Sequence, residues 1–206
     1  MLEIALAVIA GTFALLTIVV QSQRKIKELK AENETQATEI VFRAESLALR
    51  VNIEDWSKIT QEMRSLMQET SIDRIFILNA FNGFHDPRWT TAVFQLSKYD
   101  DKMASYIHFG IDEHYVSILK ETRKKGMIMV DVSEIPESII RSVYHTEGVL
   151  ASVWYFIKDK KLSTGSVGLT YCTFSSRSVT DIPSSDLDRC AVLANQIRGA
   201  IEKEEK

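Results

Sequence analysis

The sequence predicts an α+β domain, with a central antiparallel sheet flanked by helices, carried behind a transmembrane helix and a helical stalk. An apolar run from Leu2 to Val20 comes first, and Gln21 to Arg50 then holds neither glycine nor proline. Strand-type and helix-type patterns alternate along the rest of the chain. We therefore expect a transmembrane signal-anchor helix at residues 1–21, a stalk at 22–51 and a domain at 52–206.

The composition is that of a globular chain and disfavours nucleic-acid binding. Hydrophobic residues make up 45% of the 206 positions and charged residues 26%, so a sizeable core can form. The formal net charge is −3, which gives no overall attraction for nucleic acid. The two cysteines, Cys172 and Cys190, make neither a C-x-x-C motif nor a disulfide framework, and they indicate a reducing compartment.

The N-terminal apolar run has the length of a membrane span, because about 18 such residues suffice to cross the hydrocarbon core of a bilayer. A cleaved signal peptide is the alternative, but it needs a positively charged start that Met1 to Glu3 do not supply. The cations come after the run instead, at Arg24, Lys25, Lys27 and Lys30. Such cations stay on the cytoplasmic side. We expect an uncleaved single-pass anchor with the bulk of the chain in the cytoplasm.

The stalk is rich in helix-forming residues and carries an imperfect heptad seam. One phase of the seam holds Ile26, Asn33, Ile40 and Leu47, and the second phase holds Leu29, Gln36 and Arg43. Asn33 at a seam position is typical of a dimeric coiled coil, where it fixes the register. The alternative is a single solvated helix that joins the anchor to the domain. We favour the dimer, and hence a homodimeric protein.

The domain is expected to open with a helix and two strands. Asn52 is suited to cap a helix, and an apolar stripe follows it: Trp56, Ile59, Met63, Leu66 and Met67. "RIFILNA", Arg74 to Ala80, is a short apolar run typical of a buried strand. Turn residues from Asn82 to Arg88 follow, and "WTTAVFQLSKYD" predicts the second strand, which we expect to end at Tyr99-Asp100-Asp101.

The remaining elements alternate in the same manner. "DEHYVSILKETRKKG" predicts a helix, "MIMVDVSE" a strand, and "PESIIRSVYHTEG" a short helix that begins at Pro136. "VLASVWYFIKDKKLSTGSVGLTYCTF" predicts a hairpin whose first strand is apolar on both faces, and so is covered on both. A closing helix begins near Ser184, where Ser185 and Asp188 make a capping-box pattern. This order of elements is typical of an antiparallel α+β domain.

Three segments resemble parts of GAF domains. "GVLASVWYFIKDKKLSTGSVGLTYC" resembles the central hairpin of that family, with Gly168 where its second strand carries a glycine. "SSDLDRCAVLANQIRGAIEKE" resembles the closing helix, and "GMIMVDVSEIPES" resembles the strand whose trailing aspartate, here Asp131, lines the family's pocket. The resemblance covers residues 52–203 and implies a GAF-like sensor fold. The Asn-Lys-Phe-Asp-Glu pattern of the cyclic-nucleotide branch and a bilin-holding cysteine are not visible, so the resemblance names no cofactor.

The resemblance also implies a ligand pocket between the sheet and the loops that flank the middle helices. Seven positions that match the family are candidate ligand-binding residues: Asn79, Phe81, Asn82, Tyr115, Asp131, Ser152 and Trp154. His85, at the end of the first strand where such a pocket would open, is an eighth candidate. The amide and carboxylate groups would hydrogen-bond a polar ligand, and the aromatic rings would stack on a flat one. The alternative is that Phe81, Tyr115 and Trp154 are core residues, as large aromatic side chains commonly are.

Other chemistry has little support in the sequence. The histidines are isolated, without the H-x-x-x-H spacing that metal sites use, so we expect no metal ligands. No P-loop or nucleophile motif occurs, and we expect no catalytic residues. Cys190 falls on the buried stripe of the closing helix, which leaves Cys172 without an evident resolving partner for redox work.

The leading hypothesis is a membrane-anchored, cytoplasmic, GAF-like module that binds a small molecule or regulates a partner protein. It would act in signal transduction through dimerisation or through that partner, and it would not be an enzyme. One alternative is a ligand-free protein-interaction scaffold. A second alternative is a small redox enzyme of the methionine sulfoxide reductase type.

Overall fold

The computed structural model describes residues 53–81, 86–99, 106, 109–161 and 167–202. The predicted anchor at 1–21 and the stalk at 22–51 lie outside these ranges. So do Asn52, Asn82 and His85. No helix in the described part of the chain combines the length and the apolar character that crossing a membrane requires.

The described strands form one antiparallel sheet in the order β3-β2-β1-β6-β5-β4. Their bounds are β1 Arg74–Phe81, β2 Trp89–Ser97, β3 Phe109–Gly110, β4 Met127–Asp131, β5 Ala151–Lys161 and β6 Val167–Ser176. β1 and β6 occupy the middle of the sheet, so each has a strand on either side. The antiparallel sheet expected from the sequence is confirmed, and the two-residue strand β3 is an addition that the sequence did not predict.

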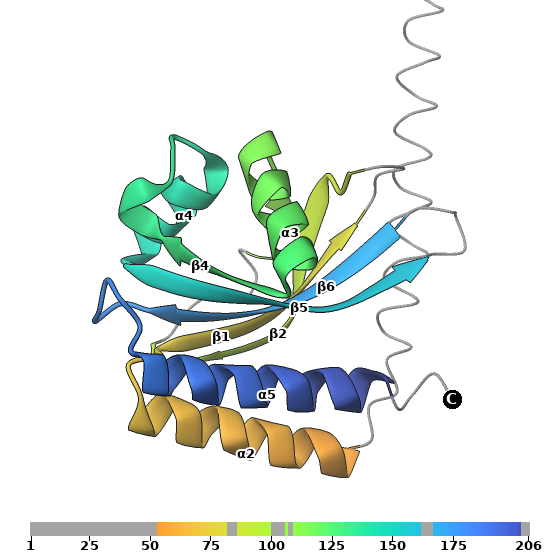
Figure 1. Cartoon of the computed structure of the whole chain (residues 1–206), viewed down its shortest axis with the longest axis vertical. Coiled ribbons are helices and arrows are strands. Elements are labelled where there is room, and N and C mark those ends of the chain that lie inside the picture. Colours follow the sequence, from red (N-terminus) through yellow and green to blue (C-terminus); the bar gives the residue numbers. More distant parts are fainter. Residues whose placement is uncertain (1–52, 82–85, 100–105, 107–108, 162–166, 203–206) are drawn as a thin grey trace, which may run out of the picture. The chain divides into compact units, whose positions relative to one another are not determined.

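Helices cover both faces of this sheet (Figure 1). α2 (Ile53–Glu69) and α5 (Ser184–Glu202) lie together on one face. α3 (Glu113–Lys125), the short 3-10 helix η2 (Val132–Glu134) and α4 (Ile139–Glu147) lie toward the other. The predicted order of helices and strands is confirmed, with η2 as a second addition.

β1 is buried along its whole length because both layers of helices pack on it. Ile75 and Ile77 belong to the core beneath α2 and α5. Phe76 and Leu78, which alternate with them, belong to the core beneath α3 and α4. Strand side chains alternate between faces, so Arg74 shares the face of Phe76, and Asn79 shares the face of Ile77. This alternation decides which polar side chains of β1 can meet a ligand on the α3/α4 side.

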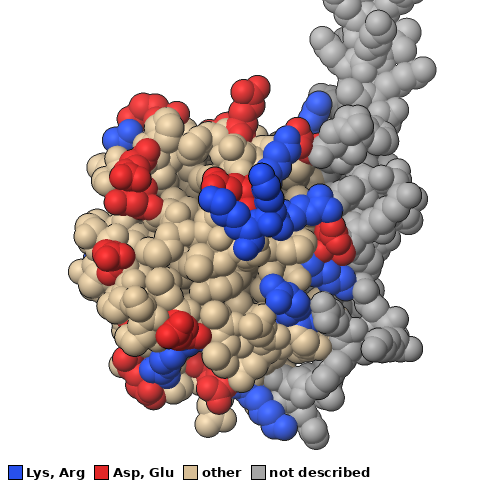
Figure 2. Space-filling model, in the orientation of Figure 1, with Lys and Arg blue, Asp and Glu red and all other residues tan. Residues whose placement is uncertain are grey.

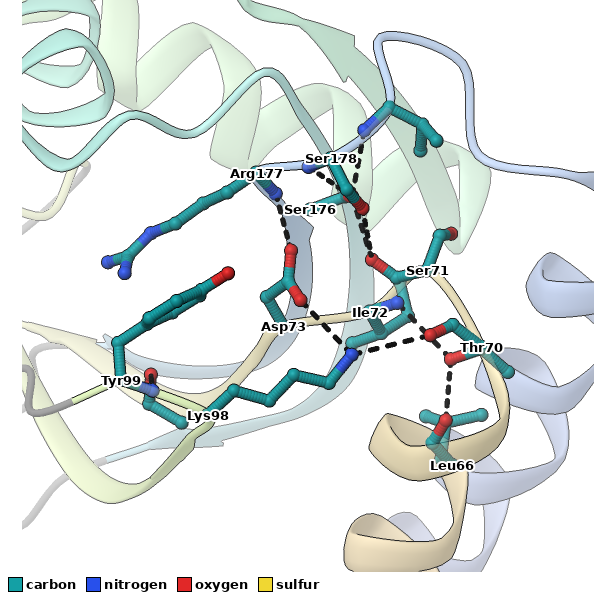
Figure 3. A network of polar contacts seen from close by, with 12 residues as sticks. Leu66, Thr70, Ser71, Ile72, Asp73, Lys98, Tyr99, Ser176, Arg177 and Ser178 are labelled. Carbon is teal, nitrogen blue, oxygen red and sulfur yellow. Dashed lines mark hydrogen bonds and ion pairs between the residues drawn. The ribbon is translucent and has the colours of Figure 1, made fainter.

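A polar network fixes the start of β1 (Figure 3). The Asp73 carboxylate accepts a hydrogen bond from the backbone N–H of Arg177 at 2.8 Å and pairs with the Lys98 ammonium at 3.1 Å. The Ser176 hydroxyl donates to the carbonyl of Ser71 at 2.7 Å. The contacts join the turn after α2 to the ends of β2 and β6, and they set the position of Arg74, the next residue along.

Capping groups hold α3 and α4 together. The Asp112 carboxylate accepts from the backbone N–H of Tyr115 at 2.8 Å, which caps α3, and from that of Ile139 at 2.7 Å, in the first turn of α4. α4 begins at Ile139 with Ser138 as its cap, rather than at Pro136 as predicted, because the Ser138 hydroxyl accepts from the third helical N–H. One carboxylate thus sets the spacing of the two helices that cover the sheet.

The start of α5 departs from the predicted capping box. Ser185 lies inside the first turn and its hydroxyl donates to Asp186 at 3.3 Å, while the Pro183 carbonyl accepts from the N–H groups of Asp186 and Leu187. Asp186 instead accepts from the N–H and the hydroxyl of Ser71, at 3.0 and 2.8 Å. The predicted cap is therefore wrong, and the acidic first turn of α5 binds the turn that precedes β1.

We predict that Asp186→Asn lowers the free energy of unfolding by roughly 1–2 kcal/mol at pH 7. Burial alone would raise the pKa of the Asp186 carboxyl, but the hydrogen bonds from Ser71 and Ser185 and the charge of Arg189 together hold this pKa below its usual range. A lowered folded-state pKa stabilises the fold above the unfolded-state value, about 3.9, and this contribution disappears as the pH falls through the folded-state value. Denaturant unfolding from pH 7 to pH 3 should show the wild type and variant converging.

Asp188→Asn is the matched control for this prediction, because Asp188 lies on the same helix but is exposed. Its free energy of unfolding should follow that of the wild type across the pH range. A gap between wild type and Asp186→Asn that stays constant down to pH 3 would contradict the assignment.

Candidate ligand site

A small, partly open cavity of about 30 Å³ lies on the α3/α4 side of the sheet. Side chains of β1, β2, β5, β6, α3 and α4 surround it, and its polar lining comes from Arg74, Thr90, Tyr106, Tyr115, Tyr144 and Thr173. A space of this size accommodates about one water molecule. The two larger hollows of the described residues are open grooves between α2 and α5, and exposed side chains such as Lys58, Glu62 and Gln196 contribute to their walls.

Arg74 is the one arginine with a fully buried side chain among the described residues, at 1% exposure. Its Nη1 donates to the Tyr106 hydroxyl at 2.9 Å and forms a short ion pair with the Glu147 carboxylate. The guanidinium carbon lies 4.6 Å from the centre of the Phe76 ring and 5.6 Å from that of the Tyr106 ring. Its Nε is buried and has no hydrogen-bond partner within the ranges that the structure describes.

Such a buried cation is costly unless it is paired, since a charge loses several kcal/mol, in order of magnitude, on leaving water. Glu147 supplies the compensating charge, and the two aromatic faces add cation–π attraction. The Nε–H group gains nothing from either contact. Arg74 is therefore paired in charge but incompletely satisfied in hydrogen bonds, at the wall of a cavity.

The fold brings together Arg74, the first residue of β1, and Glu147, the last residue of α4. Glu147 is the last residue of α4, which stops because Gly148 adopts the left-handed conformation, with φ of 68°. Leu150 then donates its N–H to the carbonyl of Ser176 at 2.8 Å, where β6 ends. Ser176 follows Ser175, which pairs with Arg74 in the sheet. The end of α4 and the start of β1 thus meet at the same corner.

Aromatic side chains fill most of the space beside the cavity. Trp154 on β5 donates its indole N–H to the Tyr144 hydroxyl at 2.9 Å. The Tyr115 ring meets the Trp154 ring edge-on, with 5.4 Å between their centres and 75° between their planes. Burial raises the pKa of both Tyr115 and Tyr144 above the usual range for a phenol. Both hydroxyls are therefore neutral and protonated at physiological pH, and each can donate as well as accept a hydrogen bond.

The structure brings three of the eight predicted residues to this side of the sheet. Tyr115 and Trp154 line the cavity, and both are also core residues, exposed by 5% and 1%. Ser152 lies two residues before Trp154, on the same face of β5. It does not line the cavity, because its hydroxyl bonds the Phe174 carbonyl and the Ser175 hydroxyl at 3.3 and 3.0 Å. Tyr115 and Trp154 are thus core residues that also line the cavity, so the two interpretations do not exclude each other.

Three other predicted residues lie elsewhere. Asn79 shares the face of Ile77, and its side-chain oxygen accepts from the Thr170 hydroxyl at 2.8 Å. Phe81 packs on Trp89 in a separate small cluster. Asp131 is exposed and caps η2 by accepting from Ser133. The alternation of β1 and the local cap of η2 explain why these positions do not line the cavity. Asn82 and His85 lie outside the described residues.

The predicted set of site residues does not include Arg74, Glu147, Tyr106 or Tyr144. Arg74 carried a usable signal, because it is a charged residue that opens an otherwise apolar strand in the phase of Phe76 and Leu78. Such a position places a cation under the same helices as the apolar side chains. The other three residues gave no comparable signal.

The two cysteines supply no reactive group to the cavity. Cys172 and Cys190 are both buried in the core beneath α2 and α5. Burial raises the pKa of both thiols, that of Cys190 to about 12, so little thiolate exists at neutral pH. Within the described ranges, no group of side chains is placed to hold a metal ion.

The cationic end of α3 is a solvated helix end. Arg123 pairs with Asp159, and Lys125 pairs with Glu121 at 2.5 Å. Figure 2 shows basic side chains next to acidic ones on this face rather than a bare basic surface. Exposed pairs of this kind contribute about 0–1 kcal/mol each.

We predict that Glu147→Ala lowers the free energy of unfolding by roughly 3 kcal/mol, because it leaves the buried guanidinium without its counter-ion. Arg74→Met combined with Glu147→Leu removes both charges and should recover most of this loss. Denaturant unfolding of the full chain measures both values. Glu137→Ala is the matched control, since Glu137 is an exposed glutamate just before α4. A double variant no more stable than Glu147→Ala would contradict the buried-charge explanation.

Comparison with known proteins shows the fold but no close relative. No protein-family model matches the chain, and no curated protein sequence matches it significantly. A far-red cyanobacteriochrome photoreceptor matches with a TM-score of 0.53 at 14% identity, over 91% of this chain and 98% of that one. The GAF domain of a two-component sensor histidine kinase from Bacillus halodurans matches with a TM-score of 0.50 at 12% identity, over 72% and 95%.

A third solved structure is a far-red-absorbing dark state with bound biliverdin, at a TM-score of 0.50 and 12% identity, over 74% of this chain and 98% of that one. Identities this low show a shared fold alone. Together with the six-stranded antiparallel sheet and its two layers of helices, these matches confirm the predicted resemblance at the level of architecture: the described domain has the fold of GAF domains.

Proposed function

We propose that this domain is a small-molecule-binding regulatory module and that its ligand site is the cavity beside Arg74. One observation carries the proposal: a fully buried guanidinium lines a small, partly open cavity and keeps an Nε–H group without a partner among the described residues. Folded proteins pair almost all their buried polar groups, and an exception needs an explanation. A bound ligand that accepts from Nε supplies one.

The lining gives the ligand its chemical outline. Arg74 offers a charged donor, and the hydroxyls of Tyr115 and Tyr144 offer donors and acceptors. Phe76 and Trp154 offer apolar walls. Convergent polar groups within apolar walls are typical of small-molecule sites. The site therefore favours a small ligand with at least one oxygen acceptor.

The volume of the cavity limits which ligands the present conformation admits. Pockets for drug-sized molecules measure about 300–1,000 Å³, whereas this cavity measures about 30 Å³. Biliverdin, which one of the similar structures holds, is far too large for it. A nucleotide or a tetrapyrrole would need α3 and α4 to move away from the sheet, and a ligand of a few heavy atoms would need the lining side chains to shift, because the present space accommodates about one water molecule.

A ligand-free protein-interaction scaffold is the second candidate, and the packing of the interior favours it. Trp154 and Tyr171 are almost fully buried on the α3/α4 side, and the Trp154 indole already has a hydrogen-bond partner in Tyr144. In that case the fold serves only to present surfaces. The redox alternative has less support, because neither cysteine lines the cavity.

We further propose that the module is anchored in a membrane by residues 1–21, with the domain in the cytoplasm, and that residues 22–51 form a dimeric stalk. The apolar run and the cations after it support the anchor, and the seam that includes Asn33 supports the dimer. A ligand would then act through a change in stalk geometry or through a partner protein. Fractionation of cell membranes and cross-linking of the full chain test these two parts directly.

Thermal unfolding of the full chain against a panel of nucleotides, amino acids, tetrapyrroles and small organic acids tests the ligand site. A ligand that binds only the folded state at 100 times its Kd stabilises that state by about 2.7 kcal/mol. We expect one class in the panel to raise the Tm of the wild type, and to leave that of Arg74→Met unchanged. If no class raises the Tm, or if Arg74→Met responds equally, the scaffold becomes the better account.

A further inference from the structure

We infer that the domain pairs with a second copy of this chain through the outer edge of β4. The two β4 strands would run antiparallel to each other with Met129 at the centre, so that the sheets of both copies become one continuous sheet. The inference goes beyond the ligand site and does not depend on it. It rests on the proposed dimeric stalk for one point, the proximity of the two copies.

β4 is the last strand on one side of the described sheet (Figure 1). The strand on the other side is β3, and its length of two residues is one of the features that keep an edge from pairing. β4 has five residues, contains neither lysine nor proline, and pairs with β5 without a bulge. Its one charged residue, Asp131, stands at its end. Of the two edges that the structure describes, β4 is therefore the one less protected against pairing.

Every second residue of β4 turns its backbone N–H and C=O away from β5. The N–H of Phe156 donates to the carbonyl of Gly126 at 2.9 Å, and that of Val132 to the carbonyl of Leu150 at 3.4 Å. Because bonded and non-bonded pairs alternate along an antiparallel ladder, the residues of β4 that bond β5 are 128 and 130. The outward backbone groups, which have no partner in the described part of the chain, belong to Met127, Met129 and Asp131.

The side chains at this edge present an apolar surface. Ile128 and Val130 pack into the core beneath α3 and α4, so the side chains of Met127 and Met129 lie on the other face of the strand. Met127 is 37% exposed and Met129 is 41% exposed. Exposed methionines adapt their shape to a partner, and neighbouring ones indicate a contact surface.

The charges around β4 favour a second copy as the partner. Lys124 lies in the last turn of α3, just before the strand, and Glu134 lies in η2, just after it. Both are exposed. In an antiparallel pair the basic end of each copy meets the acidic end of the other, and the two-fold symmetry repeats this contact. A parallel pair would bring like charges together, which is unfavourable.

A pairing centred on Met129 satisfies all the outward groups of the strand. Met129 then exchanges both backbone hydrogen bonds with Met129 of the second copy, and Met127 exchanges both with Asp131 of the second copy. A shift by one residue would oppose outward groups with groups that already bond β5. A shift by two residues would leave an outward residue of β4 without its match in the other strand. The register is therefore defined by the strand itself.

The edge is too short to hold two free domains together. Stable interfaces bury about 1,200–2,000 Å², and a strand of five residues covers only part of that area. Two domains joined by a dimeric stalk meet instead at an effective concentration on the order of mM, at which weak pairing suffices. The stalk would thus supply the proximity, and β4 would define how the two domains meet.

The test is disulfide formation between copies of the full chain that carry Met129→Cys. The Cα atoms of a bonded antiparallel pair lie about 5.5 Å apart, within the reach of a disulfide. Met127→Cys is the matched control, since it is on the same strand with similar exposure. The two copies of residue 127 would be about 13 Å or more apart, beyond that reach. Cys172 and Cys190 are buried, so the wild type should not link.

We expect Met129→Cys to link the copies at least about tenfold faster than Met127→Cys, because only its thiols are held within bonding distance. Met127→Cys combined with Asp131→Cys should link as readily as Met129→Cys, since these two residues oppose each other across the pair. Each of these side chains is exposed, so the Tm of the unlinked variants should stay close to that of the wild type.

Hydrogen exchange of the full chain gives a second measurement that needs no cysteine. In the paired wild type, the outward N–H groups of Met127, Met129 and Asp131 should exchange as slowly as those of Ile128 and Val130. Met129→Lys places a charge on the edge, which opposes pairing. It should speed exchange at the outward N–H groups alone, because β5 still protects the inward ones.

Equal linking of Met129→Cys and Met127→Cys would overturn the antiparallel register. Absence of linking, or rapid exchange of the outward N–H groups in the wild type, would overturn pairing with a second copy, as would be found if a strand of another protein binds this edge. Asn33→Cys separates the result from the stalk. If Asn33→Cys links and Met129→Cys does not, the stalk stands and the β4 pairing is wrong; if neither links, both are wrong.

Discussion

The burial of the Arg74 guanidinium beneath α3 and α4 is the constraint on which this side of the domain depends. β1 is covered on both faces, so a cation in its first position cannot reach water by a small movement. Its charge must be compensated where it stands, and Glu147 at the end of α4 does this. The length of α4, the left-handed Gly148 and the return of the chain into β5 all serve to place that carboxylate.

A polar network just before β1 supports the corner at which Arg74 meets Glu147. Asp73 and Ser71 bind the ends of β6 and the start of α5, and so they fix the backbone on the N-terminal side of Arg74. The Asp73 carboxylate and the Ser176 hydroxyl both have partners within the fold, and both residues are almost fully buried. This network is structural. At the cavity, the Nε–H group of Arg74 is buried without a hydrogen-bond partner among the described residues.

The sequence predicted the architecture well because periodicity carries that information. The apolar stripe of α2 and the two apolar faces of β5 each implied a burial that the structure confirms, as in Met63 and Val153. The residues of the candidate site were harder to predict than the architecture. Asn79 was assigned to the pocket without regard to its phase along β1, which turns it toward α2 and α5. The pairing of Arg74 with Glu147 spans 73 positions and depends on the register of β1 with β6, which no local pattern encodes.

The central claim, that a ligand completes the hydrogen bonds of Arg74, is tested most directly by the NMR signal of its Nε–H group. The signal is assigned in the full chain by its loss in Arg74→Lys, and the ligand classes of the thermal-unfolding panel are then titrated one at a time. The account predicts a change in the chemical shift of this signal that saturates, while that of the exposed Arg123 does not change. A signal from Arg74 that stays constant, or that moves in step with Arg123, would contradict it.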